Sequence, residues 1–474
     1  MRVSYRIDDR PLVLLFFLKY RSFMFLLLLG AVFFRLMSLA SPFPELSQQG
    51  YYALVIFGLS VVLWVGNILP LAITSLLVMG LLSAYQVLGR NVVYSFFGDS
   101  AIFFILGAFI IAAAASSTGL SRRLAHRILC GYGGSPAGLL LSVFFLSAIM
   151  SFFMPSHAVA ALLFPLLVEI TRALGLEKGS RLGKFIFFAL CWGAVIGSGA
   201  TFLGGARIPL AAGILQASTG LEIGFLEWFV AVGPIVALML AAGALFLLCV
   251  AGVGSERLDL VGKNREACRV GKVSFNEAKA AALLAATIYL WVFHDKTLGI
   301  ANIALISAAM YFVLGLVTWE EVAREINWGT IFMFGGALAL GRSLSETGVL
   351  QWLSRAYLAN LSPFVFFLLV STSATFLTEA ISNTAVVAIL MPVTLELSAR
   401  TGLDPRVATY ALATAAGLSF MLPMGTPPNA IAYASGFLTV REAVKYGLAL
   451  NLLSLAVFVV MALLYWPFLG LKVL

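Results

Sequence analysis

Two short polar stretches interrupt the apolar second half of this 474-residue chain. The first, TEAISNTA at 378–385, groups Ser382, Asn383 and Thr384. The second, LPMGTPPNAIAYASG at 422–436, contains Gly425 followed by two adjacent prolines. Hydroxyl, amide and freed carbonyl oxygens of this kind can coordinate Na+, and the N-termini of half-helices can direct N–H dipoles at an anion. A plainer alternative is that these small polar side chains only hold helices together.

The composition places both stretches in a membrane protein. Hydrophobic residues make up 61% of the chain and charged residues 11%, with a mean hydropathy of +1.02, whereas a soluble domain carries about a quarter charged residues. Apolar runs recur from end to end, as spanning helices require. Examples are Phe23–Leu39, Tyr52–Val65, Phe229–Val250 and Leu450–Leu469. The pattern predicts an all-α polytopic membrane protein, since a β-barrel would alternate with a period of two.

Both polar stretches are predicted to be breaks within helices at membrane depth. Pro427 and Pro428 remove backbone donors and stop a helix, and Gly425 permits unusual dihedral angles. Neither stretch is rich in charge or flanked by long polar loops. Because lipid tolerates irregular backbone only where it is buried in protein or lines a wet cavity, these breaks are expected to line a site.

Positive charge is concentrated beside the apolar runs. The net charge is +9, and the flanking basic residues predict cytoplasmic segments by the positive-inside rule. They are Arg2, Arg6, Arg10, Lys19, Arg21, Arg122, Arg123, Arg127, Arg257, Lys263, Arg265, Arg269, Lys272 and Lys279. Because these charges form no basic domain, a nucleic-acid partner is not expected. The N-terminus lacks the features of a cleavable signal peptide.

The four cysteines show no metal-ligand spacing. They are Cys130, Cys191, Cys249 and Cys268, and three of them lie in or beside apolar runs. Buried free thiols are therefore expected in preference to disulfides.

The chain contains an internal repeat. Residues 101–119 align without gaps on 330–348, with seven of 19 positions identical, and 155–176 align on 382–403, with eight of 22 identical. The offsets are 229 and 227. The predicted organisation is an N-terminal extension with the first transmembrane helix (1–50), a first repeat (51–253), a charged cytoplasmic linker (254–279) and a second repeat (280–474). Duplicated halves, often inverted, are typical of secondary transporters.

The stretches LTEAISNTAVVAILMP, LSFMLPMGTPPNAIAYASG and LVTWEEVAREINWGTIFMFGGALALG (316–341) resemble the signature stretches of the divalent anion:sodium symporters, the DASS family. The resemblance extends to the two-half layout. It implies a homodimer with a scaffold domain and a moving transport domain of elevator type. Each half would hold a re-entrant hairpin tipped by an SNT motif, with the substrate between the tips and a sodium ion at each.

The resemblance also assigns roles in the second half. It implies a sodium site formed by Thr378, Ile381, Ser382, Asn383, Gly425 and Asn429, which follows Thr426, Pro427 and Pro428. Asn383, Thr384 and Pro427 would contact the substrate.

The first half departs from the family pattern. Pro155, Ser156 and His157 stand at the SNT position, and Gly204, Gly205, Ala206, Arg207 and Ile208 stand at the GTPPN position. By the resemblance, Ser151 and Gly204 are the residues left to form a first-half sodium site. Ser156, His157 and Arg207 would contact the substrate. Because proline has no hydroxyl to replace serine, the chemistry of this half is expected to differ.

Four ionisable groups lie in or near the apolar runs. Arg207 is hypothesised to replace the first-half sodium ion as a tethered cation and to attract the anion through bidentate contacts; alternatively, it ends its helix and snorkels to the interface. His157 could couple transport to protons or be a neutral, hydrogen-bonded histidine. Glu379 is expected to brace the hairpin, and Glu396 to form a structural i,i+4 pair with Arg400.

Together these patterns predict a multi-pass inner-membrane transporter of small di- or polyvalent anions, dicarboxylate-like or sulfate-like, coupled to sodium through the second-half site. An anion exchanger or a proton-coupled carrier is the alternative. Three scattered histidines and no carboxylate pair at ligand spacing argue against an enzyme, and a receptor would not need two broken helices per half. The expected partners are the anion, Na+, the bilayer and a second copy of the chain. No cofactor is expected, and Na+ is the one metal.

Overall fold

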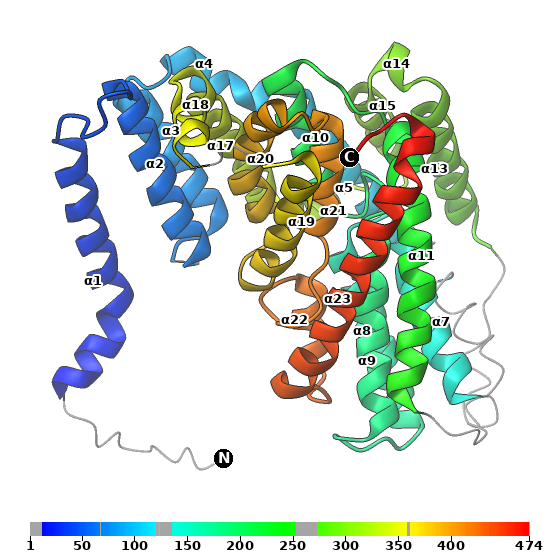
Figure 1. Cartoon of the computed structure of the whole chain (residues 1–474). Helices are drawn as coiled ribbons and strands as arrows, with labels where there is room; N and C mark the ends of the chain where they lie inside the picture. The colour runs from blue at the N-terminus through cyan, green and yellow to red at the C-terminus, as the bar shows by residue number, and fades with distance from the viewer. Residues whose placement is uncertain are drawn as a thin grey trace.

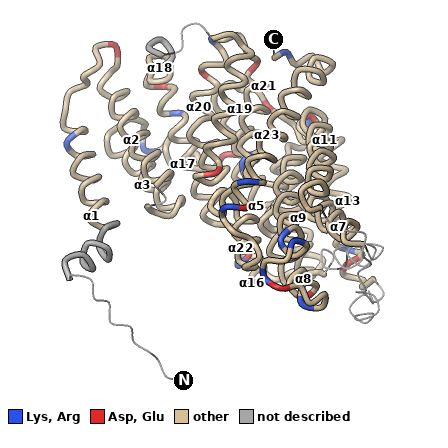
Figure 2. The backbone as a smooth tube through the Cα atoms, turned by 60° about the horizontal axis from the view of Figure 1, so that its bottom comes forward, with Lys and Arg blue, Asp and Glu red and all other residues tan. Residues whose placement is uncertain are grey.

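The computed structural model describes residues 12–66, 68–119, 123, 135–252, 273–357 and 361–473. These residues form helices joined by turns and loops, with no strand among them. The predicted all-α class is therefore confirmed. Seven helical segments of the described part are long and apolar enough to cross a membrane, and charged residues are sparse along the tube of the backbone (Figure 2). The chain is thus a multi-pass membrane protein.

One helix precedes the repeated region. Helix α1 (Leu12–Met37) lies at one side of the molecule beside α2 (Figure 1). The apolar runs of the sequence match helices, but their bounds differ by several residues. For example, the run predicted to begin at Leu450 belongs to a helix that begins ten residues earlier, at Val440, where Thr439 caps its N-terminus by accepting a hydrogen bond from Glu442 N.

The remaining described helices form two runs with a similar order of long helices. The first run is α2 (Gln48–Val65), α3 (Leu71–Ala84), α4 (Arg90–Ser95), η1 (Phe96–Gly98), α5 (Ser100–Ser117), α7 (Pro136–Met150), α8 (Ser156–Ala173), α9 (Arg181–Gly197), α10 (Arg207–Thr219) and α11 (Phe225–Ala251). The second run is α13 (Phe275–Phe293), α14 (Asp295–Leu298), α15 (Ile300–Val313), α16 (Trp319–Glu325), α17 (Trp328–Glu346), α18 (Val349–Tyr357), α19 (Pro363–Ala380), α20 (Asn383–Thr401), α21 (Pro405–Ala415), α22 (Pro427–Ala434), α23 (Val440–Leu464) and η2 (Trp466–Leu469). The short elements α14, α18 and η2 have no described counterpart in the first run.

The two runs interleave. Helix α3 packs against α17 and α5 against α15, so that each of these pairs joins one helix from each half. Glycines make these approaches possible, because a Cβ at Gly107 would lie 2.7 Å from the Ala304 Cβ and one at Gly336 would lie 2.5 Å from the Ser75 Cβ. The domain boundaries predicted from the repeat stay a prediction. The linker 254–279 lies mostly outside the described residues.

Most of the predicted cytoplasmic basic residues and two of the cysteines also lie outside the part of the chain that the structure describes. Arg123 is described, and its Nη2 forms an ion pair of 2.7 Å with Glu277 at the start of α13. Cys191 is a buried free thiol, as expected, but Cys249 is exposed on α11, so the expectation of burial is wrong there. Cys249 lies on α11, an apolar helix that is long enough to cross a membrane.

Candidate functional site

Helices α19 and α20 form a hairpin with a two-residue tip. Ile381 is extended and buried, and Ser382 is the N-cap of α20, where its Oγ accepts a hydrogen bond of 3.3 Å from Ala385 N. The predicted sodium ligand Ser382 is therefore already engaged in capping the helix. Asn383 and Thr384, the first residues of α20, are half-buried.

Three oxygen atoms crowd together beside this tip. The Thr378 hydroxyl lies 2.7 Å from Oδ1 of Asn383 and 2.9 Å from the carbonyl oxygen of Ala416. One hydroxyl hydrogen cannot satisfy both acceptors fully. A group of close oxygens with too few hydrogens favours a cation, and Na+ is a hard cation that prefers oxygen ligands.

The loop 416–426 follows α21 and completes the surroundings of these oxygens. Gly425 approaches the hairpin so closely that a Cβ there would lie 3.0 Å from the carbonyl oxygen of Thr378. Three more oxygens of this region are buried with no hydrogen-bond partner among the described residues: Ser419 Oγ, Thr426 Oγ1 and Asn429 Oδ1. Buried polar atoms are nearly always paired in native proteins. These three oxygens are therefore candidate ligands for a cation or an ordered water.

Asn429 contributes mainly to the shape of this loop. Its Nδ2 donates 3.1 Å hydrogen bonds to the carbonyl oxygens of Ser419 and Leu422. Its predicted role as a sodium ligand could be fulfilled only by the remaining Oδ1. The amide thus braces the loop against the start of α22.

The predicted second break is displaced along the chain. Non-helical backbone begins at Ala416, earlier than the 422 expected, and residues 427–434 are helical as α22. The prediction was wrong because the adjacent prolines occupy the first turn of a helix, where a missing N–H costs nothing. Thr426 is the N-cap, and Pro427 is exposed at the first helical position.

The first-half tip keeps a connection between its hairpin and its loop. Ser156 N donates a 3.1 Å hydrogen bond to the Gly204 carbonyl, and the Thr201 hydroxyl donates one of 2.6 Å to the Phe152 carbonyl. A Cβ at Gly204 would lie 2.6 Å from the carbonyl oxygen of Ser151, whose own hydroxyl is buried without a partner among the described residues. Ser151, Ser156 and Gly204 therefore lie together, and their roles toward sodium and substrate stay a prediction.

Arg207 turns inward from the start of α10. It is 3% exposed, and its Nε donates a 3.0 Å hydrogen bond to the carbonyl oxygen of Ala413 in the last turn of α21. Nη1 lies 3.2 Å from the hydroxyl of Ser198, which caps the C-terminus of α9. The guanidinium thus sits between the C-terminal ends of two broken helices, where carbonyl groups concentrate negative charge. This burial leaves no room for snorkelling to the interface.

Glycines surround this guanidinium. A Cβ at Gly417 would lie 2.5 Å from Cζ of Arg207, and one at Gly205 would lie 2.6 Å from Nη1. Any larger residue at either position would displace the charged group.

His157 faces a different space from the second-half tip. It lines a cavity of about 210 Å³ together with Pro155, Ser116 of α5 and Glu325 of α16. None of the predicted second-half substrate residues lines this cavity. The structure therefore does not bring His157 together with Asn383, Thr384 and Pro427 in this cavity.

The short helices that follow the two loops, α10 and α22, each pack against helices of the other half. Helix α10 of the first half packs against α20 and α21 of the second, and α22 of the second half packs against α8 and α9 of the first. Figure 1 shows α10 beside α20 and α22 below α19. Each of α8, α10, α20 and α22 begins at a break, and these contacts join the helices of one half to those of the other.

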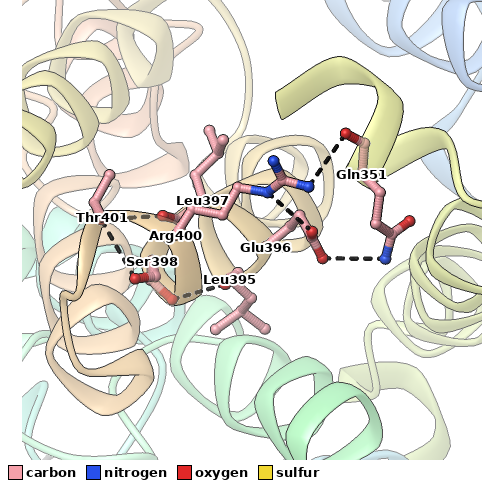
Figure 3. A network of polar contacts seen from close by, with 7 residues as sticks. All are labelled: Gln351, Leu395, Glu396, Leu397, Ser398, Arg400 and Thr401. Carbon is pink, nitrogen blue, oxygen red and sulfur yellow. Dashed lines mark hydrogen bonds and ion pairs between the residues drawn. The ribbon is translucent and has the colours of Figure 1, made fainter. Parts of the chain in front are cut away.

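The predicted pair of Glu396 and Arg400 lies near the C-terminal end of α20, the end opposite to its tip, and Figure 3 shows the contacts of this pair. Their side chains are 3.6 Å apart, Gln351 of α18 donates to Glu396 at 3.3 Å, and Arg400 donates to the Gln351 carbonyl at 3.4 Å. The i,i+4 pair is confirmed, and it ties the end of α20 to α18.

Sequence comparison places this arrangement in a known family. Residues 22–472 match the family model described as the sodium:sulfate symporter transmembrane region. The chain belongs to this family. Among its curated relatives, the protein of Staphylococcus saprophyticus named sodium-dependent dicarboxylate transporter SdcS is 29% identical over 94% of this chain and 92% of its own length. A protein of the same name from Staphylococcus aureus strain USA300 is 28% identical over 93% of this chain and 90% of its own length.

Two solved structures share the fold at low sequence identity. MtrF of Neisseria gonorrhoeae, described as illuminating a class of antimetabolite efflux pumps, superposes with a TM-score of 0.57 and 14% identity over 92% of this chain and 97% of its own. The YdaH transporter of Alcanivorax borkumensis superposes with a TM-score of 0.54 and 18% identity over 88% and 98%, respectively. These similarities concern the fold alone.

Sequence reasoning missed several groups at the site. Ser198, Ser419 and the carbonyl groups of Ala413 and Ala416 became visible only through the contacts between the halves. Asn451 could have been noticed, because it is a lone amide in the apolar sequence of α23.

Proposed function

We propose that this protein is a secondary active transporter of small di- or polyvalent anions, dicarboxylate-like or sulfate-like, coupled to sodium through the second-half site. The observation that carries this proposal is the group of oxygens formed by Thr378, Asn383 and Ala416, in which two acceptors share one hydroxyl hydrogen. Unwound backbone and half-helix C-termini are the usual cation sites of secondary transporters.

The anion is proposed to bind at the half-helix N-termini. Ser156, Asn383 and Thr384 are half-buried and Pro427 is exposed, so these tips are accessible to a ligand. The positive dipole end of α20, beside the side chains of Asn383 and Thr384, favours a compact anion, whereas α22 begins with two prolines that have no N–H to donate. The family description names sulfate and the curated relatives are named for dicarboxylates, so both anions are candidates for this chain.

The second candidate function is anion exchange or proton-coupled transport with Arg207 in place of the first sodium ion. The position of its guanidinium between the C-terminal ends of α9 and α21 favours this candidate, because that place is where a half-helix pair would hold a cation. A tethered cation cannot dissociate, so the first half would no longer couple transport to a sodium gradient.

We further propose the features that the family resemblance implies. They are an inverted relation of the two repeats, a scaffold with a moving transport domain, a homodimer and a bacterial-type inner membrane. No catalytic role is proposed for any residue.

Uptake into proteoliposomes tests the proposal. Labelled succinate and sulfate are offered under an inward Na+ gradient, under a pH gradient alone, and against preloaded unlabelled anion. The sodium-coupled proposal expects uptake driven by Na+ and lost in Asn383→Ala, which keeps the helix but removes the amide oxygen. Uptake only against internal anion, or only with a pH gradient, would instead establish the second candidate.

A further inference from the structure

A buried carboxylate lies against the amide groups of the loop that follows α21. Glu379, in the last turn of α19, is 3% exposed. Its Oε1 accepts hydrogen bonds from the backbone N of Phe420 at 2.7 Å and of Met421 at 3.1 Å, and its Oε2 accepts one from Leu422 N at 2.9 Å. Three consecutive N–H groups aimed at one point form a nest, an arrangement that binds anions. Here the protein supplies the anion itself.

A fourth donor connects this carboxylate to the last long helix. Asn451, fully buried in α23, donates from Nδ2 to Glu379 Oε1 at 2.8 Å. Glu379 therefore joins the hairpin, the loop and α23 at one point. Each of these hydrogen bonds has a charged acceptor, and such bonds are roughly twice as strong as neutral ones.

The nest is part of the same loop that holds the cation oxygens. Ala416 precedes the three amide groups and Gly425 follows them, while Thr378 is the chain neighbour of Glu379. A Cβ at Gly425 would lie 3.3 Å from the Glu379 Cα. Fixing 420–422 on the carboxylate therefore fixes the distance from the loop to the oxygens of Thr378 and Asn383.

The two halves differ at this position. The repeat offset of 227 places Phe152 opposite Glu379, so the first-half hairpin lacks the carboxylate. Its tip is held by the hydrogen bond between Thr201 and the Phe152 carbonyl, and the buried charge of that half is the cation of Arg207. Among the described residues, Glu379 is the one buried acid beside either tip. Since a fixed negative charge in a low-dielectric site favours a cation over water, the asymmetry matches a cation site in the second half alone.

We infer that Glu379 is a positioning residue of the second-half sodium site: it holds residues 420–422 so that Ala416 and Gly425 face Thr378 and Asn383, and its negative charge raises sodium affinity. This inference rests on the proposed function. It separates Glu379 from the residues that touch the ion, because its carboxylate oxygens are occupied by four N–H donors.

The experiment compares wild type, Glu379→Gln, Glu379→Asp and Glu396→Gln in proteoliposomes with succinate or sulfate, whichever the wild type takes up. The sodium concentration for half-maximal uptake and the anion KM at saturating sodium are measured separately. A second readout is the rise in melting temperature of purified protein when NaCl replaces choline chloride. Glu396→Gln is the matched control, because it neutralises an acid that pairs with Arg400 away from the tips.

In Glu379→Gln, the half-maximal sodium concentration is expected to rise at least tenfold and the sodium-dependent shift in melting temperature to disappear, while the anion KM changes less than threefold. Glu379→Asp keeps the charge but shortens the reach, so an intermediate rise is expected. Should Glu379→Gln not be recovered as folded protein, Asn451→Leu, which removes one donor and leaves the carboxylate, is expected to raise the half-maximal sodium concentration three- to tenfold.

Two results overturn the inference alone: a sodium-dependent wild type with unchanged sodium dependence in the folded variants, or an equal loss of sodium and anion affinity, which indicates a merely structural role. A wild type that transports without sodium dependence overturns the sodium-coupled function, and the inference with it.

Discussion

Arg207 and Glu379 bind the two ends of one stretch of backbone, Arg207 through a carbonyl group and Glu379 through amide groups. The guanidinium lies 3.0 Å from the Ala413 carbonyl, where α21 ends, and the carboxylate lies 2.7 Å from the Phe420 amide, where the loop turns its N–H groups inward. Carbonyl groups thus meet the cation and amide groups meet the anion. The stretch 413–422 is thereby fixed by two charged side chains that come from different halves of the chain.

Removing the Thr378 hydroxyl tests the oxygen group directly. Thr378→Val keeps the side-chain shape but deletes the oxygen that lies 2.7 Å from Asn383 and 2.9 Å from Ala416. We expect at least a tenfold rise in the half-maximal sodium concentration in an uptake assay. Thr287→Val is the control, because that buried hydroxyl bonds only within its own helix α13, to the Leu283 carbonyl at 2.8 Å. Equal behaviour of the two variants would argue against a cation at Thr378.

Replacing Arg207 should lower both stability and transport. Arg207→Ala removes the donor of the Ala413 carbonyl, and an unsatisfied buried group costs about 1–3 kcal/mol, while the Ser198 hydroxyl keeps its 2.7 Å hydrogen bond to the Val195 carbonyl. We expect a lower melting temperature and at least a tenfold higher anion KM. Arg207→Lys keeps the charge without the planar fork, so it should recover part of the stability. Unaltered anion affinity in a folded Arg207→Ala protein would show that the guanidinium has a structural role only.

A methyl group at Gly417 should reproduce the loss of Arg207. The added Cβ would lie 2.5 Å from Cζ and 2.6 Å from Nε of the guanidinium, a separation that forces one of them to move. Gly417→Ala is expected to raise the anion KM in the same direction as Arg207→Ala. Gly80→Ala in α3 is the control, since a Cβ there meets nothing within 4 Å. The double variant Gly417→Ala with Arg207→Ala should be no worse than Arg207→Ala alone, because the clash is then absent.

The pair of Glu396 and Arg400 should tolerate change. Glu396 and Arg400 are partly exposed, with side-chain exposures of 21% and 38% and a separation of 3.6 Å, and pairs of this kind contribute about 0–1 kcal/mol. Glu396→Gln keeps a hydrogen-bond acceptor for Gln351 (Figure 3). We expect the melting temperature and the sodium dependence of uptake to stay close to those of the wild type.

The sequence predicts the helices and the hairpin tips well because both depend on local patterns. Apolar runs and the SNT stretch each reflect residues within about 20 positions of one another. The sequence predicted that the second break begins at residue 422, six residues later than it does. The prediction was late because α21 ends at two alanines, Ala415 and Ala416, and alanine is not a helix-breaking residue. The carbonyls and amides of this stretch are bound by Arg207 and Glu379 from distant parts of the chain.

The partners of Glu379 could not be foreseen for the same reason. Its isolation in an apolar run indicated a buried group that needs donors, and bracing of the hairpin was expected. The donors themselves lie 41 to 72 residues away in sequence. His157 illustrates the opposite case, since its position in the tip suggested a substrate contact while its ring lines a separate cavity with Glu325.

The opposite signs of Arg207 and Glu379 have an electrical consequence. A single fixed charge carried across the full membrane field does work of about 2.3 kcal/mol per 100 mV. Because both side chains are bound to the stretch 413–422, a displacement of that stretch along the field moves no net charge from this pair. The current of a transport cycle would then come from the ions and anions that bind and leave. Neutralising either residue alone would leave one uncompensated charge on this stretch, so that any displacement of the stretch along the field would carry that charge with it.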